Sequence, residues 1–425
     1  MSSAGTLAAR STDHQRCAAN VPTTRVRQAS RRSRVSFAVG LAAATATQLR
    51  AGGVIGLGEL ILLGWSVATI AQRTWRVERA RLTVVMRFNV VTLLSICVGT
   101  VVGGLFEQKY AVFLVRNVLA FSLAALCLGA VTFSEHRHDL LMTWQRLWPL
   151  MVAAPSLVLF MLSHSRRSFL GLALYSGDYS VYSRFNGWTT NPNQFAFFIG
   201  IAMYLAALSA VDDLRALRYI RFVLNASIAL CSMYLGLASN SDGFRVALAA
   251  SLPLVVILSL ARTRRTVGGV SRWVLCVLLA IVMVLKLPAA FAQAHAIQEY
   301  GGQGSIRTTL WKSCAGVLAK FPFTGIGSGL PAHAYGGRFE CHNAYLGLAT
   351  AGGVAAAAMC LYALGRLALG AARCNPMLFG SLVWLAISMA FNDPVRHTIF
   401  WIFLALAAQL LLSGGAPGRS RRGAP

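Results

Sequence analysis

Long apolar stretches separated by short polar segments follow one another through most of the chain. A helix that crosses a bilayer needs roughly 17 to 25 mainly apolar residues, and stretches of about this length recur from one end of the sequence to the other. They lie near residues 35–49, 53–71, 82–106, 112–133, 147–163, 195–211, 220–237, 244–260, 273–291, 344–365, 377–390 and 398–413. This pattern predicts an all-α polytopic membrane protein with about twelve transmembrane helices.

Composition agrees with a membrane protein. Of the 425 residues, 56% are hydrophobic and only 12% are charged, and the mean hydropathy is +0.60, which a soluble domain of this size would hardly tolerate. The net charge of +26 would suggest nucleic-acid binding in a soluble protein. Here the charges lie between apolar helices, so we expect membrane lipids as their partners and no nucleic acid.

Lysine and arginine are unequally shared between the two sides of the predicted membrane domain. The polar segments on the side of the N-terminus hold 25 of the 39 lysines and arginines. Cytoplasmic loops carry such an excess, so both termini are expected in the cytoplasm. Residues 1–34 and 414–425 are polar and arginine-rich and resemble no cleavable signal peptide. They are predicted to be disordered tails on either side of a membrane domain at 35–413.

Two loops on the opposite, outer side are too long to be simple turns, residues 164–194 and residues 292–343. Loops of this length are usually functional or disordered. In the second loop, "SIRTTLWKSCAGVLAKF" has an approximate helical stripe of apolar residues and predicts a helix at the membrane surface, which "FPFTGIGSG" ends. Cys314 and Cys341 both lie in this loop. In an oxidising compartment they either pair or remain thiols.

Acidic residues are scarce, which narrows the possible chemistry. The chain has 13 aspartates and glutamates and contains no DxD, CxxC or HExxH motif and no phosphate-binding P-loop. A metal-dependent transfer from a soluble nucleotide sugar would lack its usual ligands. We therefore expect neither a metal nor a cofactor.

Isolated cations on the outer face are the first candidates for a site. Arg184, Arg245 and Arg307 all lie close to predicted helix ends on that side. Guanidinium groups match phosphate oxygens, so two or three of them around one cavity could bind a diphosphate without metal. Each could instead reach lipid headgroups from a helix end. Arg245 follows a helix-start signature that favours anions, and Asp242 could neutralise it.

Amides and one histidine accompany these cations. Asn191 and Asn193 flank Pro192 in "NPN", where they could cap a helix or hydrogen-bond a sugar or phosphate. His342, at the edge of the apolar run that follows "ECHNAY", is the outer-face side chain best suited to take a proton at neutral pH. It could equally be a helix-end residue that reaches water.

Four short motifs on the outer face resemble those of the O-antigen ligase and polymerase superfamily in order and spacing. They are "SRFNGWTTNPNQFAFF", "SNSDGFRVALA", "FPFTGIGSG" and "CHNAYLGLATAGG", the last of which contains the HNxxL pattern. The resemblance spans about residues 35–413 and includes the long outer loop between helices nine and ten. It implies a GT-C type glycosyltransferase in a bacterial inner membrane, with its active site on the periplasmic face.

The resemblance also implies a reaction, that of an O-antigen ligase in lipopolysaccharide biosynthesis. The donor would be undecaprenyl-diphosphate-linked O-antigen and the acceptor a sugar hydroxyl of the lipid A core oligosaccharide, joined by metal-independent, inverting glycosyl transfer. Carried over by position, His342 would be the catalytic base, and Arg184 and Arg245 would bind the diphosphate. Arg307 and Asn343 are further candidates for holding donor or acceptor.

Three other functions stay open. An O-antigen polymerase would show two large outer loops, whereas residues 164–194 form a clearly smaller loop than residues 292–343. A protein O-oligosaccharyltransferase would carry a periplasmic domain after the last helix. A lipid or sugar transporter would place ionisable residues inside its helices, where only Glu59 and Arg87 are candidates.

Overall fold

A computed structural model describes residues 23–51, 55–71, 84–106, 111–134, 136–176, 184–263, 303–328 and 341–414. This part of the chain is mostly helical. Its helices are α1 Thr23–Ala43, α2 Leu57–Ala71, α3 Val84–Phe106, α4 Ala111–Thr132, α5 Arg137–Ser163, α6 Pro192–Arg215, α7 Tyr219–Ala238, α8 Asp242–Thr263, α10 Gln303–Lys320, α12 Ala344–Cys374, α13 Pro376–Met389 and α14 Thr398–Gly414.

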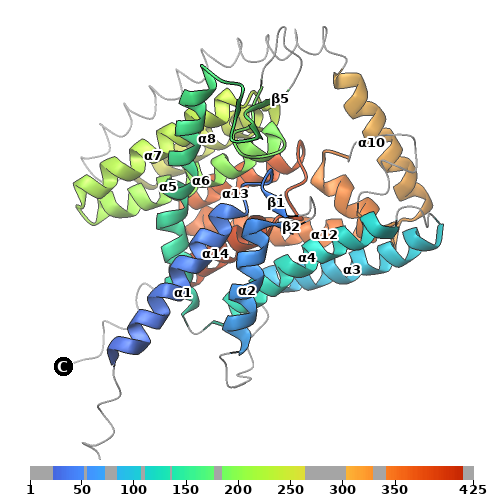
Figure 1. The fold of residues 1–425 in the computed structure, drawn as a ribbon, viewed down its shortest axis with the longest axis horizontal. Helices are drawn as coiled ribbons and strands as arrows, with labels where there is room; N and C mark the ends of the chain where they lie inside the picture. Colours follow the sequence, from blue (N-terminus) through green and yellow to red (C-terminus); the bar gives the residue numbers. More distant parts are fainter. Residues whose placement is uncertain are drawn as a thin grey trace, which may run out of the picture.

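The helices form two groups, one around α6 and one around α3, and α13 contacts both groups (Figure 1). Helix α6 packs against α5 and α7, and α3 packs against α4 and α12, while α13 contacts both α8 and α12. Helix α6 is apolar on all sides, as expected of a helix enclosed by others, and 83% of its most apolar 18-residue segment is buried. A Cβ on Gly200 would lie 2.1 Å from Trp384, so only glycine lets α6 and α13 approach this closely.

Seven of the described helices are long and apolar enough to cross a membrane, namely α3 to α8 and α12. Three shorter apolar helices accompany them, at Leu57–Ala71, Pro376–Met389 and Thr398–Leu412. The expected ninth helix, residues 273–291, lies outside the described residues, as do the terminal segments 1–22 and 415–425. The structure therefore gives a multi-helix membrane architecture and leaves the count of twelve crossings a prediction.

The N-terminal helix differs from the expected one. Residues 1–34 were predicted to be a disordered tail and residues 35–49 a helix, but α1 begins at Thr23 and ends at Ala43. Its first half has no glycine or proline and contains several arginines, which are good helix formers. The helix ends early because Thr45 Oγ1 donates to Ala42 O at 2.7 Å and Thr47 turns toward the start of α6, where its Oγ1 donates to Gln194 Oε1.

Helix α5 is also longer than expected. The polar segment at residues 134–146 was predicted to be a cytoplasmic loop, yet the helix already begins at Arg137 and continues through Pro149 and Pro155 to Ser163. Asp139 in its first turn lies 3.7 Å from Arg34 of α1. Residues 136–139 are exposed, whereas the side chains of Trp144 and Trp148 further along are fully buried, so the polar segment extends the helix beyond its buried part.

The outer loop 164–194 contains strands that an all-α prediction does not include. Strand β3 Ser168–Phe169 pairs with β4 Leu172–Ala173, and β5 Tyr175–Ser176 pairs with β6 Arg184–Phe185, with Ser176 opposite Arg184. Strands β1 Arg50–Ala51 and β2 Ile55–Gly56 form a third small hairpin. Each strand has only two residues, too few for a sequence pattern of period two to show.

The helical geometry of α12 is interrupted near its start, and the chain that follows α10 supplies replacement hydrogen bonds there. Gly352 and Gly353 have non-helical backbone angles, with φ +76° at Gly353. The freed carbonyl groups of Thr350 and Ala351 accept hydrogen bonds from the N–H groups of Ile326 and Gly327 at 2.9 and 3.0 Å. A broken helix at membrane depth is tolerated only with such replacement partners. The motif "FPFTGIGSG" is therefore a structural partner of α12.

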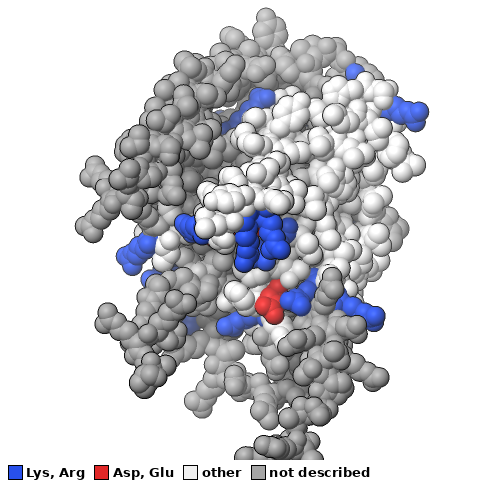
Figure 2. Space-filling model, turned by 90° about the vertical axis from the view of Figure 1, so that its left-hand side faces the viewer, with Lys and Arg blue, Asp and Glu red and all other residues white. Residues whose placement is uncertain are grey.

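Another group of arginines lies near the turn between α6 and α7, at the opposite end of α6 from its start. Figure 2 shows a group of lysine and arginine side chains near the middle of one face of the molecule, with a single acidic patch below it. Arg215 lies 4.0 Å from Asp212 and Arg218 lies 3.7 Å from Asp213. This is the end predicted to face the cytoplasm.

Candidate functional site

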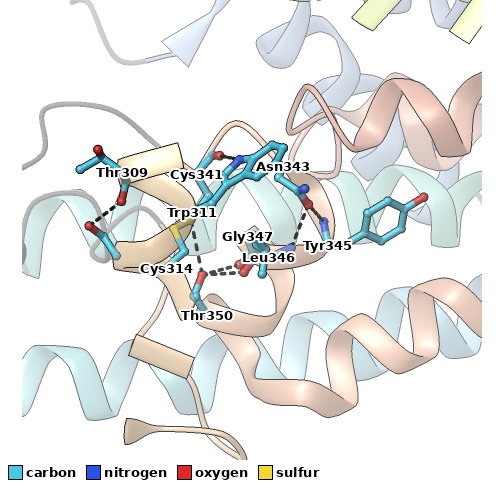
Figure 3. The surroundings of a disulfide bond; sticks show 10 residues. Thr309, Trp311, Cys314, Cys341, Asn343, Tyr345, Leu346, Gly347 and Thr350 are labelled. Atoms are coloured by element: carbon cyan, nitrogen blue, oxygen red, sulfur yellow. Dashed lines mark hydrogen bonds between the residues drawn. A yellow bond between two sulfur atoms is a disulfide. The ribbon is translucent and has the colours of Figure 1, made fainter. Parts of the chain in front are cut away.

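The chain around His342 is held by a disulfide bond (Figure 3). Cys314 of α10 is bonded to Cys341, 27 residues further along the chain. The indole Nε1 of Trp311, also on α10, donates to Cys341 O at 3.1 Å. Pairing was one of two possibilities left open for these cysteines. The bond fastens the residue directly before His342 to the surface of α10.

His342 itself occupies an unusual backbone conformation. Its φ is +47°, in the left-handed region that non-glycine residues seldom adopt. The next residue, Asn343, caps α12, because its Oδ1 accepts the N–H groups of Tyr345 and Leu346 at 3.0 and 3.1 Å. A disulfide on one side and a helix cap on the other thus hold a half-buried histidine in a strained position. Such strain clusters at functional sites.

Arg184 lies in a hydrogen-bonded cluster between the starts of two helices. Its Nη2 donates to Asn193 Oδ1 at 2.7 Å and its Nε to Ser239 O at 3.3 Å. Ser241 Oγ donates to the same Asn193 oxygen at 3.0 Å. Asn193 belongs to α6, and Ser241 directly precedes α8. The cluster therefore brings together two sequence segments about fifty residues apart, and two of its members, Arg184 and Asn193, were candidates from sequence.

Arg245 lies one turn into α8, beside this cluster. Its Nη2 donates to Asn240 Oδ1, and its backbone N–H bonds to Ser241 O at 3.1 Å. Asn240 has φ +50°, so the turn before α8 is shaped to bring the amide back to the guanidinium. Both Arg184 and Arg245 thus donate to amide oxygens at helix starts, the first to Asn193 at the start of α6 and the second to Asn240 just before α8.

A short segment that the sequence did not single out joins three helix starts. Residues 391–393 follow α13. Asn392 Nδ2 donates to Asn193 O at 3.0 Å, at the start of α6. A Cβ on Gly243 of α8 would lie 2.7 Å from Phe391, and one on Gly347 of α12 would lie 3.2 Å from Asp393 Oδ2. The segment places a carboxylate next to the first turn of α12, directly after His342. No motif marked it, because its role depends on contacts between distant residues.

Two other candidates have different outcomes. Asn191 caps α6, since its Oδ1 accepts the N–H of Asn193 at 2.8 Å, as the capping alternative predicted. Arg307 lies in α10, but its side chain lies outside the described residues. Within the described part of the chain, no group of three or more histidine, cysteine, aspartate or glutamate side chains is arranged to hold a metal ion.

Comparison with known families gives a match over the part of the chain that contains much of this geometry. Residues 226–361 match the model of the O-antigen ligase family. This match supports membership of the O-antigen ligase family. The matched range includes Arg245, Arg307, His342 and Asn343, whereas Arg184 and the amides at the start of α6 precede it. No curated protein and no solved structure matches the chain.

The match to the O-antigen ligase family indicates the general kind of activity. The family covers O-antigen ligases and polymerases, which are glycosyl-transferring enzymes with lipid-linked polysaccharide substrates. Together with the apolar helices, it indicates a multi-pass membrane protein of O-antigen biosynthesis.

Proposed function

We propose that this protein is an O-antigen ligase that transfers O-antigen from undecaprenyl diphosphate to the lipid A core oligosaccharide at the periplasmic face of a bacterial inner membrane. The observation that carries the proposal is the contact of one segment, residues 391–393, with the starts of α6, α8 and α12. These are the helix starts that hold or adjoin Arg184, Arg245 and His342, and residues 226–361 match the O-antigen ligase family.

The two arginines suit the leaving group. As the bond between the sugar and the diphosphate breaks, negative charge grows on the phosphate oxygen, and fixed cations in a poorly hydrated site stabilise that charge in the transition state. Hydrogen bonds from Arg184 to Asn193 and from Arg245 to Asn240 fix the direction of each guanidinium. A donor site fixed before binding avoids reorganisation during the reaction.

His342 suits the acceptor. A sugar hydroxyl is too weak an acid to ionise first, so a base must remove its proton while the oxygen attacks, an effect of about 10²- to 10⁴-fold. The proton passes from the hydroxyl oxygen to the imidazole, and the electron pair of the broken bond stays with the diphosphate. Attack from the face opposite the diphosphate inverts the anomeric carbon. The scarcity of acidic motifs in the sequence supports a metal-independent reaction, and the resemblance to the family implies the GT-C type.

The polymerase alternative differs in its acceptor, which would be a second lipid-linked O-antigen. Expression of the full chain in a ligase-deficient bacterial strain separates the two functions. We expect the lipopolysaccharide ladder on gels to return. If no ladder returns in that strain, but chain length is restored in a polymerase-deficient strain that still has its ligase, the ligase proposal is wrong and the polymerase function is right.

A further inference from the structure

A second group of cations lies at the outer end of α5, away from the candidate catalytic residues. A cavity of about 320 Å³ opens there, lined by Ser163, His164, Ser165, Arg166, Arg167 and Tyr175. Pockets that take small molecules begin at about 300 Å³, so the cavity has room for a phosphorylated sugar. None of the six lining side chains is acidic, and two of them are arginines, whose forked donors match phosphate oxygens.

Stabilisation of the helix end does not account for these arginines. Cations near a helix C-terminus can bond its unpaired carbonyl groups, but three carbonyl groups in the last turn of α5, those of Phe160, Met161 and Leu162, already have partners. Phe160 O accepts from Ser163 Oγ at 2.5 Å and lies 3.0 Å from His164 Nδ1. Leu162 O accepts the N–H groups of Ser165 and Arg166. The bonds to these carbonyl groups come from Ser163, His164 and backbone N–H groups.

The cavity and Arg184 share one hairpin. Tyr175, which lines the cavity, pairs with Phe185 across strands β5 and β6, and the next pair is Ser176 with Arg184. Successive side chains of a strand point to opposite faces, so Tyr175 and Arg184 lie on opposite faces of the hairpin. The ring of Phe160 links the cavity to the hairpin, because its centroid lies 5.0 Å from that of His164 and 5.2 Å from that of Phe185. Two cationic sites are thus built on the two sides of one small element.

An exposed leucine in the same loop as the two arginines fits a ligand that is carried by a lipid. Leu170 lies in the turn between β3 and β4 and is 85% exposed. Met161, which lies near the end of α5 and shortly before this loop, is 65% exposed. Apolar side chains next to basic groups are typical of surfaces that enter the interface between headgroups and acyl chains. A free phosphate ion would need no such neighbours.

We propose that this cavity binds a phosphate group on the headgroup of the acceptor glycolipid, which places the acceptor on one side of the β5–β6 hairpin and the donor diphosphate on the other. The inference rests on the proposed ligase function for the identity of the acceptor. Its physical content is separate, because it assigns phosphate recognition to Arg166 and Arg167, which the proposed transfer does not use.

The test compares the full-length wild type with the double variant Arg166→Gln, Arg167→Gln in nanodiscs of neutral lipid. The probes are lipid A core and the same glycolipid after enzymatic removal of its phosphates. We expect the double variant to bind the phosphorylated probe about tenfold more weakly, as loss of charge-assisted hydrogen bonds predicts. The dephosphorylated probe should bind the wild type just as weakly. Arg116→Gln, an exposed arginine of α4, is the matched control and should bind like the wild type.

Competition distinguishes the possible sources of phosphate. Inorganic phosphate and phosphatidylglycerol should not displace the glycolipid at equal concentration. Displacement by inorganic phosphate would show a simple anion site, displacement by phosphatidylglycerol would show general headgroup binding, and either result overturns the proposal. Equal binding of both probes by the wild type would overturn it as well.

Kinetics separate this inference from the proposed function. In the double variant, the KM for the acceptor should rise about tenfold, as the weaker binding predicts, while kcat and the KM for the donor stay unchanged. A wild type that transfers normally, together with a double variant of unchanged acceptor KM, would refute the pocket assignment and leave the ligase function standing. A wild type that transfers nothing to lipid A core would refute the ligase function, while the binding measurements would still decide the pocket.

Discussion

Arginines at the two ends of the helix bundle have different partners. At the end predicted to be cytoplasmic, Arg215 and Arg218 lie against Asp212 and Asp213. At the opposite end, Arg184 donates to the amide oxygen of Asn193 and to a backbone carbonyl, and Arg245 donates to the amide of Asn240.

The difference separates two uses of the same residue type. A carboxylate partner cancels the charge of an arginine and forms an ion pair that contributes about 0 to 1 kcal/mol to stability at an exposed site. An amide oxygen fixes the direction of the guanidinium and leaves its charge in place. We expect arginines oriented in this way to suit an anionic ligand, and the following experiments test this comparison.

The largest effect is expected at His342, at the outer end. Replacement His342→Asn keeps a residue that tolerates the left-handed backbone but cannot take a proton, so transfer should fall by about 10²- to 10⁴-fold. Initial rates with purified donor and acceptor measure the loss. His136→Ala, an exposed histidine before α5, is the control and should keep full activity. A His342→Asn variant as active as this control would exclude His342 as the base.

Arg184→Lys should reduce the transfer rate by about 100-fold, because a single ammonium group does not replace a fork aimed at the developing charge. Arg215→Lys at the inner end keeps a cation beside Asp212 and should leave the rate unchanged. The two variants, assayed side by side under saturating donor, show whether guanidinium geometry matters only at the outer end. Equal losses in both would end the distinction between the two groups of arginines.

Asn193→Asp would replace the amide partner of Arg184 by a carboxylate, the kind of partner that Arg215 and Arg218 have. The new carboxylate lies where Arg184 Nη2 now bonds, at 2.7 Å, and should weaken donor binding about tenfold by cancelling the cation's charge. An anion in the first turn of α6 should at the same time raise stability by about 0.3 to 1 kcal/mol. Donor affinity and thermal unfolding measured together separate the two effects.

The neighbouring residue provides the control for Asn193→Asp. Gln194→Glu adds the same charge to the same helix turn, where the Oε1 atom already accepts from Thr190 Oγ1. It should stabilise α6 in the same way and leave donor binding unchanged. If Gln194→Glu weakens donor binding as much as Asn193→Asp does, the effect is one of general charge and not of the contact with Arg184.

The smallest effect is expected at the inner end. Asp213 is buried, lies 3.7 Å from Arg218 and accepts from Asn225 Nδ2 at 2.9 Å. Asp213→Asn should lower the free energy of unfolding by about 1 kcal/mol through loss of the ion pair without changing the transfer rate. Thermal unfolding in detergent and a rate assay measure the two quantities. A clear loss of activity would give this pair a role beyond stability.

Much of the helical plan could be predicted from sequence, and the errors concern particular helices. Apolar runs placed α6, α7 and α13 within a few residues of their observed bounds. The start of α5 was wrong, because its polar residues 137–139 are helical although they are exposed, and α1 begins before the predicted residue 35. The break in α12 was also missed, since it depends on the loop at residues 321–327, which lies far away in the unfolded chain.

The candidate site follows the same division. The sequence pointed to Arg184, Arg245 and His342, because permanent cations and a histidine are conspicuous among so few charged residues. It could not show that Asn193 binds Arg184 while Asn191 only caps a helix, since both amides lie in the same tripeptide. It also could not choose between paired and free cysteines at 314 and 341, which depends on the distance between α10 and the start of α12.

By itself, the sequence determined the class of protein and predicted which end of its helices carries the reactive groups, because hydropathy and charge are properties of single residues and their order. Only the tertiary structure decided that Arg184 and Arg245 donate to amides and that Arg215 and Arg218 lie beside carboxylates. It also decided that residues 391–393 join three helix starts and that a second cationic cavity lies behind the β5–β6 hairpin. These features are contacts between distant segments, and such contacts exist only once the helices have packed.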